Sequence, residues 1–146
     1  MSDSISSVNS SSQKILLIGG CGYVGSYLYQ QLERAGFIVT VVDLLKRGNP
    51  LGLKVIEDDY ANLQQDFLRQ FDAVLWFGGH SSVGQSLADP DGAAFNNCVN
   101  LFSFAKLLAV HTKLIYASSA SLYSTKSTPV VPASEGSLIN IPSQNA

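Results

Sequence analysis

Five short apolar runs follow one another along the chain, separated by polar turns or by segments with helical spacing. They lie at residues 14–18, 37–43, 53–57, 73–77 and 113–117. A strand that is buried on both faces of a parallel sheet is apolar throughout, whereas a strand with one solvated face alternates. The continuous runs therefore predict buried, parallel strands.

Helical patterns occupy the connections between these runs. Apolar residues recur on one helix face after the first run, at Val24, Leu28, Leu32 and Ala35. Gly36 follows in the position of a C-cap. Further helices are predicted at residues 62–70 and 89–111, the second with Pro90 in its first turn. Strands that alternate with helices form right-handed βαβ units, so we expect an α/β fold of Rossmann type. The expected parallel sheet has about five strands and is incomplete, with helices on both faces.

The composition is that of one globular domain, with 146 residues, 46% of them hydrophobic and 14% charged. The formal net charge is −2 and the longest basic run is Lys46-Arg47, so no nucleic-acid partner is expected. No apolar stretch approaches the roughly 20 residues that cross a bilayer, so no membrane partner is expected either. Cys21 and Cys98 stand far apart, which fits a reduced cytoplasmic protein.

The two ends of the chain have a different character from its centre. Residues 1–13 contain seven serines and predict a disordered lead-in, with a weak transit peptide as the alternative. Residues 14–125 are predicted to form a nucleotide-binding domain. Residues 126–146 are polar and interrupted by prolines, and are expected to be an irregular segment that leads to a missing C-terminal part.

A glycine-rich segment follows the first strand and opens the first helix. Residues 20–25 match GxGxxG, and Gly19 extends the match. Such glycines form a tight turn, admit a pyrophosphate close to the backbone and allow the helix to pack on the strand. The N–H groups at the helix start then face the phosphates. The alternative is a glycine-rich turn without a ligand.

An acid at the end of the second strand complements this loop. Asp43 lies 24 residues after Gly19, close to the spacing expected for an acid that binds a ribose diol. A carboxylate there repels a 2′-phosphate, so the sequence favours NAD over NADP. Lys46 and Arg47 leave NADP open, because they are able to bind a 2′-phosphate.

The glycine loop, together with residues 118–123 (Ser-Ser-Ala-Ser-Leu-Tyr), resembles the extended short-chain dehydrogenase/reductase family. Within it, the chain is most similar to the NAD-dependent epimerase/dehydratase group, of which UDP-galactose 4-epimerase is one member. The resemblance covers residues 14 to about 125. It implies a nucleotide-sugar substrate, bound NAD and hydride transfer to and from a sugar carbon.

The resemblance also implies roles for particular residues. Ser119 matches the catalytic serine or threonine, although residues 118–121 also fit a polar exit from a strand. The residues that match cofactor contacts are Gly19, Gly22, Tyr23, Val24, Gly25, Asp43, Asp59, Tyr60, Phe77, Gly78, Gly79 and Asn97. Tyr23 and Val24 are expected to act through their backbone N–H groups, and Asp59 to contact the adenine amino group. No metal site is implied.

One family feature is missing from the chain. The catalytic base in relatives is a tyrosine followed four residues later by a lysine, and none of the six tyrosines here has that lysine. We therefore expect a truncated chain without turnover of its own, derived from an epimerase, dehydratase or reductase. The alternative is a non-catalytic NAD-binding module. Loss of the helix that carries this pair predicts exposed apolar sheet surface and self-association, including a homodimer.

Several single residues have simpler interpretations. His80 is expected in a solvated loop near the cofactor, with a substrate contact as the alternative. Cys21 is expected to be a small packing residue rather than a nucleophile. Trp76, Phe102 and Phe104 are expected in the core or in helix packing.

Overall fold

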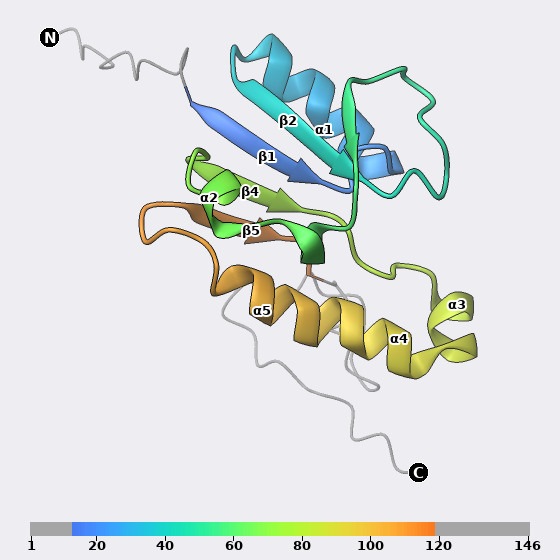
Figure 1. Ribbon diagram of the computed structural model, residues 1–146. Coiled ribbons are helices and arrows are strands. Elements are labelled where there is room, and N and C mark those ends of the chain that lie inside the picture. Colours follow the sequence, from blue (N-terminus) through green and yellow to red (C-terminus); the bar gives the residue numbers. More distant parts are fainter. Residues whose placement is uncertain (1–12, 119–146) are drawn as a thin grey trace, which may run out of the picture. The chain divides into compact units, whose positions relative to one another are not determined.

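Five parallel strands form one sheet in the order β3-β2-β1-β4-β5 (Figure 1). The computed structural model describes residues 13–118. The strands are β1 (Lys14–Ile18), β2 (Ile38–Asp43), β3 (Val55–Glu57), β4 (Ala73–Trp76) and β5 (Lys113–Tyr116). Each neighbouring pair is parallel, and central β1 sets Leu16 opposite both Thr40 of β2 and Val74 of β4. The predicted Rossmann-type sheet of five strands is confirmed.

Helices connect the strands. They are α1 (Tyr23–Arg34), α2 (Gln65–Leu68), α3 (Val83–Ala88), α4 (Pro90–Ala94) and α5 (Leu101–Ala105), with a 3₁₀ turn η2 (Tyr60–Asn62). A π-helical stretch η3 (Phe95–Asn100) joins α4 to α5, so that residues 90–105 form one continuous helix. No helix within residues 13–118 is long and apolar enough to span a membrane.

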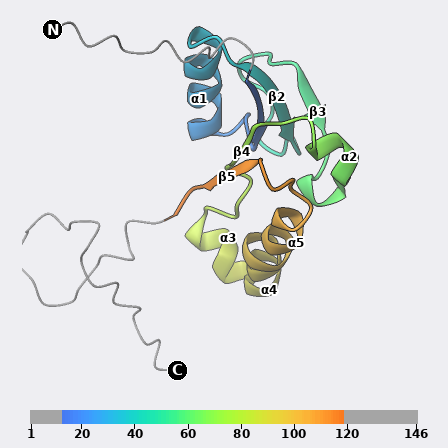
Figure 2. The same cartoon turned by 90° about the vertical axis from the view of Figure 1, so that its left-hand side faces the viewer.

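The sheet separates two apolar clusters, because successive side chains of β1 point to opposite faces. Ile15 and Leu17 pack with Val41 and Leu75 on the face that α1 covers. Leu16 and Ile18 pack on the other face with a larger set of side chains: Val42, Tyr60, Leu63, Leu68, Phe71, Val74, Trp76 and Phe104. Figure 2 shows α1 on one side of the sheet and α2 and α5 on the other. Every β1 residue after Lys14 is buried, which explains its unbroken apolar run.

Local signals define the ends of two helices as predicted. α1 ends at Arg34 with Ala35 as its C-cap, and Gly36 follows with φ +87°, a conformation that favours glycine. α4 begins with Pro90 after Asp89, whose side chain accepts a hydrogen bond from the Gly92 N–H at 2.9 Å.

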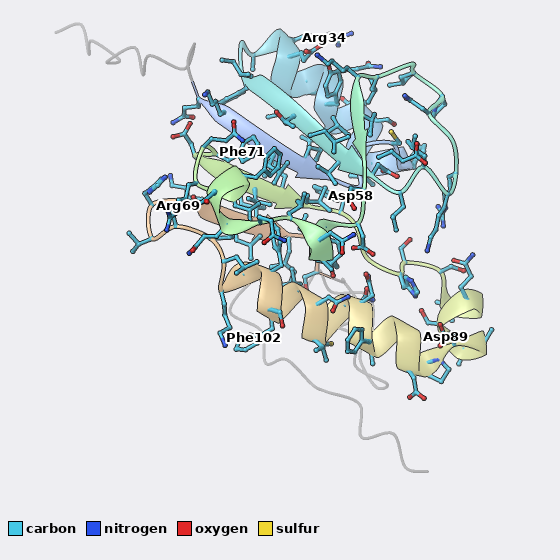
Figure 3. The ribbon with its side chains drawn as sticks, viewed as in Figure 1. Arg34, Asp58, Arg69, Phe71, Asp89 and Phe102 are labelled. Atoms are coloured by element: carbon cyan, nitrogen blue, oxygen red, sulfur yellow. The ribbon has the colours of Figure 1, made fainter. Side chains whose placement is uncertain are left out.

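Four expectations are corrected. The strand predicted from residue 53 begins only at Val55, because Leu53 pairs with the Asn49 side chain in a closed loop. The helix predicted over residues 62–70 is split into the η2 turn and the short α2. The long helix ends at Ala105 rather than near residue 111, and α3 before it was not predicted. Phe102 is 69% exposed and points away from the sheet (Figure 3). Phe104 and Trp76 are buried, as expected.

Apolar side chains also lie open at the edge strand. β5 pairs only with β4 among the described strands, and its Ile115 and Tyr116 are 53% and 58% exposed. The predicted exposure of apolar sheet surface is confirmed for β5, whereas Val74, Leu75 and Trp76 of β4 are buried. The self-association expected from it stays a prediction.

Candidate functional site

The carboxyl ends of β1, β2 and β4 bring the glycine loop, Asp43 and residues 77–79 together. The Gly19 N–H donates to the Val42 carbonyl and the Phe77 N–H donates to the Ile18 carbonyl, each at 2.9 Å. The chain that leaves β1 is therefore hydrogen-bonded to β2 on one side and to the end of β4 on the other. This is the carboxyl end of the strands, where ligands bind in open α/β folds.

Two of the loop glycines are required by the protein's own packing. Gly19 has φ +76°, and a Cβ on it would lie 2.6 Å from the Phe77 carbonyl oxygen. A Cβ on Gly25 would collide with the Gly19 carbonyl oxygen and the Gly20 backbone. These residues hold the turn and let the first turn of α1 lie against it.

Gly22 is different, because internal packing places little demand on it. A Cβ there would meet only the Gly19 carbonyl oxygen, at 3.3 Å. Gly22 is also the N-cap of α1, and no side chain caps that end. No acidic residue stands in the first turn. The helix start therefore presents backbone N–H groups beside a position without a side chain, which fits the close approach of an anion.

Tyr23 and Val24 supply two of these N–H groups. Their side chains are 92% and 54% exposed, so they contribute little to the core. Both line an open hollow of about 470 Å³ on the flank of α1, completed by Ser26, Tyr27, Gln30 and Leu51. Val24 was expected on the inward helix face, and its exposure corrects that expectation.

Asp43 is bonded to the glycine loop. Its Oδ2 accepts the Cys21 N–H at 2.9 Å, and its Oδ1 accepts the Leu45 N–H at 2.8 Å. A carboxylate offers about four acceptor positions, so further donors have room. Burial raises the pKa of the Cys21 thiol and the Asp43 charge adds to the rise, which supports a packing role for Cys21.

Asp59 and Tyr60 begin the η2 turn after β3. The Asp59 carboxylate accepts the Ala61 N–H at 3.0 Å and caps that turn. Tyr60 is 4% exposed, and its ring makes edge contacts with Trp76 and Phe104. Burial raises the pKa of the Tyr60 phenol to about 12, and the Asp59 carboxylate adds to the rise. The nearby Trp76 indole N–H acts in the other direction and lowers the pKa of Tyr60. No acceptor lies in good hydrogen-bonding geometry to that N–H.

Residues 77–80 follow β4, and two asparagines of the π-helical stretch η3 hydrogen-bond their backbone. The Asn97 side chain accepts the His80 N–H at 2.8 Å and donates to the His80 carbonyl at 3.2 Å. Asn96 donates to the Gly78 carbonyl at 3.2 Å. Asn96 was not singled out in the sequence, where its only signal is that it adjoins Asn97.

The remaining expected residues are placed as follows. Ser119 lies outside the described residues, so its role stays a prediction. Lys46 and Arg47 are exposed on the loop after Asp43. Within residues 13–118, no group of three or more His, Cys, Asp or Glu side chains is arranged to hold a metal.

Comparisons with known proteins identify the family to which the chain belongs. A model of the NAD dependent epimerase/dehydratase family matches residues 15–144. The chain belongs to this family. Its resemblance to the group is thereby confirmed, and the family description names NAD as the cofactor of its members.

Individual relatives are mainly epimerases. The chain is 34% identical over 129 residues to UDP-glucose 4-epimerase 1 of Oryza sativa subsp. japonica, covering 75% of this chain and 36% of the relative. It is 31% identical over 130 residues to the UDP-glucose 4-epimerase of Corynebacterium glutamicum, covering 84% and 39%. The crystal structure of UDP-glucose 4-epimerase from Brucella ovis in complex with NAD superposes with TM-score 0.73 at 27% identity, covering 88% and 42%. The chain thus spans less than half the length of these relatives.

Proposed function

We propose that this chain is the cofactor-binding part of an NAD-dependent sugar-nucleotide epimerase. The observation that carries the proposal is the uncapped start of α1 beside Gly22, with Asp43 bonded to the same loop. A diphosphate accepts hydrogen bonds from the N–H groups of Tyr23, Val24 and Gly25 at this helix start. NAD, when bound, supplies a reversible hydride acceptor that no side chain offers.

Asp43 selects the adenosine ribose in this proposal. Each of its oxygens already accepts one backbone N–H, which fixes the carboxylate in place, and each retains a position for a ribose hydroxyl. Its charge disfavours a 2′-phosphate. Lys46 and Arg47 on the following loop are the feature that favours NADP instead, so a competition titration between the two cofactors belongs in the test.

The choice of an epimerase rests on the relatives. Both curated relatives described above carry that name, and the matched family also includes dehydratases. Ser119 is proposed to hydrogen-bond the sugar oxygen during hydride transfer. Because no tyrosine of this sequence has a lysine four residues later, we expect these 146 residues to bind NAD without turnover.

A non-catalytic NAD-binding module is the second candidate, and the missing Tyr–Lys pair favours it. The coding sequence after Ala146 separates the candidates, because Tyr-x-x-x-Lys there supports the enzyme and a stop codon supports the binder. C4 epimerisation of UDP-glucose by the chain supplied with NAD tests the inactivity that both candidates predict, and turnover would contradict it.

We further propose a homodimer formed by the outer face of the helix that spans residues 90–105. Phe95, Val99 and Phe102 lie along this face and are 57%, 50% and 69% exposed. Exposed Asp91 precedes them and exposed Lys106 follows, with its Nζ 5.5 Å from the centre of the Phe102 ring. We call these five residues the outer stripe.

The order of charges along the outer stripe supports a second copy of this chain as its occupant. Two such helices packed antiparallel set Asp91 opposite Lys106 of the partner subunit. The same register sets Phe95 opposite Phe102 of the partner subunit, and the twofold axis falls beside Cys98 and Val99. One patch is thus complementary to itself in both charge and apolar surface, as a twofold interface requires.

The cytoplasmic location expected from the two cysteines stays a prediction.

A further inference from the structure

A chain of side-chain hydrogen bonds connects the η2 turn after β3 to the segment after β4. The Tyr60 hydroxyl donates to the Asn96 carbonyl at 2.6 Å. The Asn96 side chain donates to the Gly78 carbonyl at 3.2 Å and to the Asn97 Oδ1 at 2.9 Å. Asn97 then brackets the backbone N–H and carbonyl of His80. Three elements far apart in sequence are thereby joined behind residues 78–80.

The side-chain amides of Asn96 and Asn97 bind this segment through its backbone N–H and carbonyl groups. Gly78 and Gly79 have no side chains by which neighbouring elements could hold them, so their position depends on backbone contacts. A Cβ on Gly79 would lie 3.1 Å from the Trp76 ring and 3.3 Å from the Asn97 Oδ1. The segment is therefore pressed closely against both its strand and η3. Adjacent residues Asn96 and Asn97 both reach it from a π-helical stretch, a geometry frequent at functional sites.

Tyr60 occupies the other end of this chain of bonds. Its side chain is almost wholly buried between Trp76 and Phe104, so its hydroxyl serves the protein interior. Its neighbour Asp59 begins the same turn and is the residue expected to contact adenine. The turn at the adenine end and the segment at the cofactor's middle are thus connected through one buried phenol and one helix carbonyl.

We propose that Tyr60, Asn96 and Asn97 are positioning residues that hold the backbone of residues 78–80 in register with the adenine turn. This inference rests on the proposed function, because it assigns the held segment to the middle of a bound NAD. The three residues act through the segment and the turn, so this proposal gives Tyr60 and Asn97 a positioning role in place of the direct cofactor contact that the family resemblance implies.

Comparing two ligands separates positioning from plain stabilisation. AMP reaches only the adenine end, whereas NAD also lies along residues 78–80. If the bonds position that segment, Asn97→Leu and Asn96→Leu weaken NAD binding by about tenfold, as expected for one or two lost hydrogen bonds. AMP binding by the same variants changes less than about twofold.

The matched control removes a similar hydrogen bond at the amino ends of β4 and β5. The Thr112 hydroxyl donates to the Phe71 carbonyl at 2.9 Å, before the amino end of β4, whereas residues 78–80 follow its carboxyl end. Thr112→Val should lower the unfolding temperature and leave both affinities unchanged. Tyr60→Phe, which removes one hydroxyl only, provides a mild variant if an asparagine replacement fails to fold.

Calorimetric titration of the full chain with NAD and with AMP gives distinct outcomes. A selective loss of NAD affinity in the asparagine and Tyr60→Phe variants supports the inference. Equal losses for both ligands, or no loss for either, overturn it while the proposed function stands. A wild-type chain that fails to bind NAD overturns the proposed function itself, and this inference with it.

Discussion

The carboxylate of Asp43 accepts a hydrogen bond from the backbone N–H of Cys21 at 2.9 Å. This bond ties the end of β2 to the centre of the glycine loop, 22 residues earlier in the chain. Asp43 therefore holds the loop in the conformation that exposes the start of α1, besides being the acid proposed to bind ribose. One residue shapes the phosphate site and selects the sugar beside it.

Replacing Asp43 should affect stability and binding together. Asp43→Ala leaves the Cys21 and Leu45 N–H groups without their acceptor, which should cost about 1–3 kcal/mol of unfolding free energy. NAD affinity should fall at least tenfold, as measured by calorimetry. Asp72→Ala is the matched control, since the Asp72 carboxylate accepts the Lys14 N–H at 2.7 Å at the amino end of β1. Weakened NAD binding in the control, or unchanged binding in Asp43→Ala, would contradict this role.

Gly25 should tolerate no side chain. Its added Cβ would overlap the Gly19 carbonyl, which belongs to a turn bonded to β2. Gly25→Ala is expected to lower the unfolding free energy by about 1–3 kcal/mol, the usual range for overpacking. Gly84→Ala in α3 meets no neighbouring atom and should be neutral or stabilising by up to about 1 kcal/mol. Urea unfolding curves of the two variants test the contrast, and equal midpoints would refute it.

Tyr60 should make stability depend on pH in alkaline solution. Its pKa rises from 10.0 to about 12 on folding, so the folded state binds the proton more tightly. The stabilisation is complete below pH 10 and is lost as the pH rises towards 12. The stability difference between the wild type and Tyr60→Phe should therefore narrow over that interval. Thermal unfolding across this range is the measurement, with Tyr27→Phe at an exposed position as control. A constant difference would show that the phenol does not contribute in this way.

The proposed dimer makes Cys98 a reporter. Cys98 is exposed and lies beside the proposed twofold axis, whereas Cys21 is buried. Mild oxidation should yield a covalent dimer, since thiols that close to an axis come within disulfide reach. Cys98→Ser should abolish the crosslink, and Phe102→Glu should give a monomer in sedimentation by placing a charge in the apolar stripe. A wild-type monomer at high concentration would rule the interface out.

The sequence predicted the parts of the fold whose signals are local. β1 was placed residue for residue, because a strand buried on both faces permits only apolar side chains after Lys14. The glycine loop and Asp43 were recognised because their spacing reflects backbone geometry. The glycine loop and Asp43 follow the carboxyl ends of two neighbouring parallel strands, β1 and β2, so the topology brings them together.

Features that depend on tertiary contact were missed. Packing of α5 against the sheet buries Phe104, so Phe102, two residues earlier on the same helix, faces outward. The role of Asn96 depends on η3 packing beside the end of β4, because that packing brings its side chain to the Gly78 carbonyl. The bond between Asp43 and Cys21 likewise joins the end of β2 to a loop whose conformation the sequence does not specify.

Titration of the folded chain with NAD, compared with the Gly22→Ala variant, tests the central claim most directly. Gly22 has little packing to lose, and alanine at an N-cap should cost less than about 1 kcal/mol in stability relative to glycine. The account predicts saturable NAD uptake by the wild type and at least tenfold weaker uptake by a normally folded Gly22→Ala. No uptake by the wild type, or equal uptake by both, would contradict a diphosphate held at the start of α1.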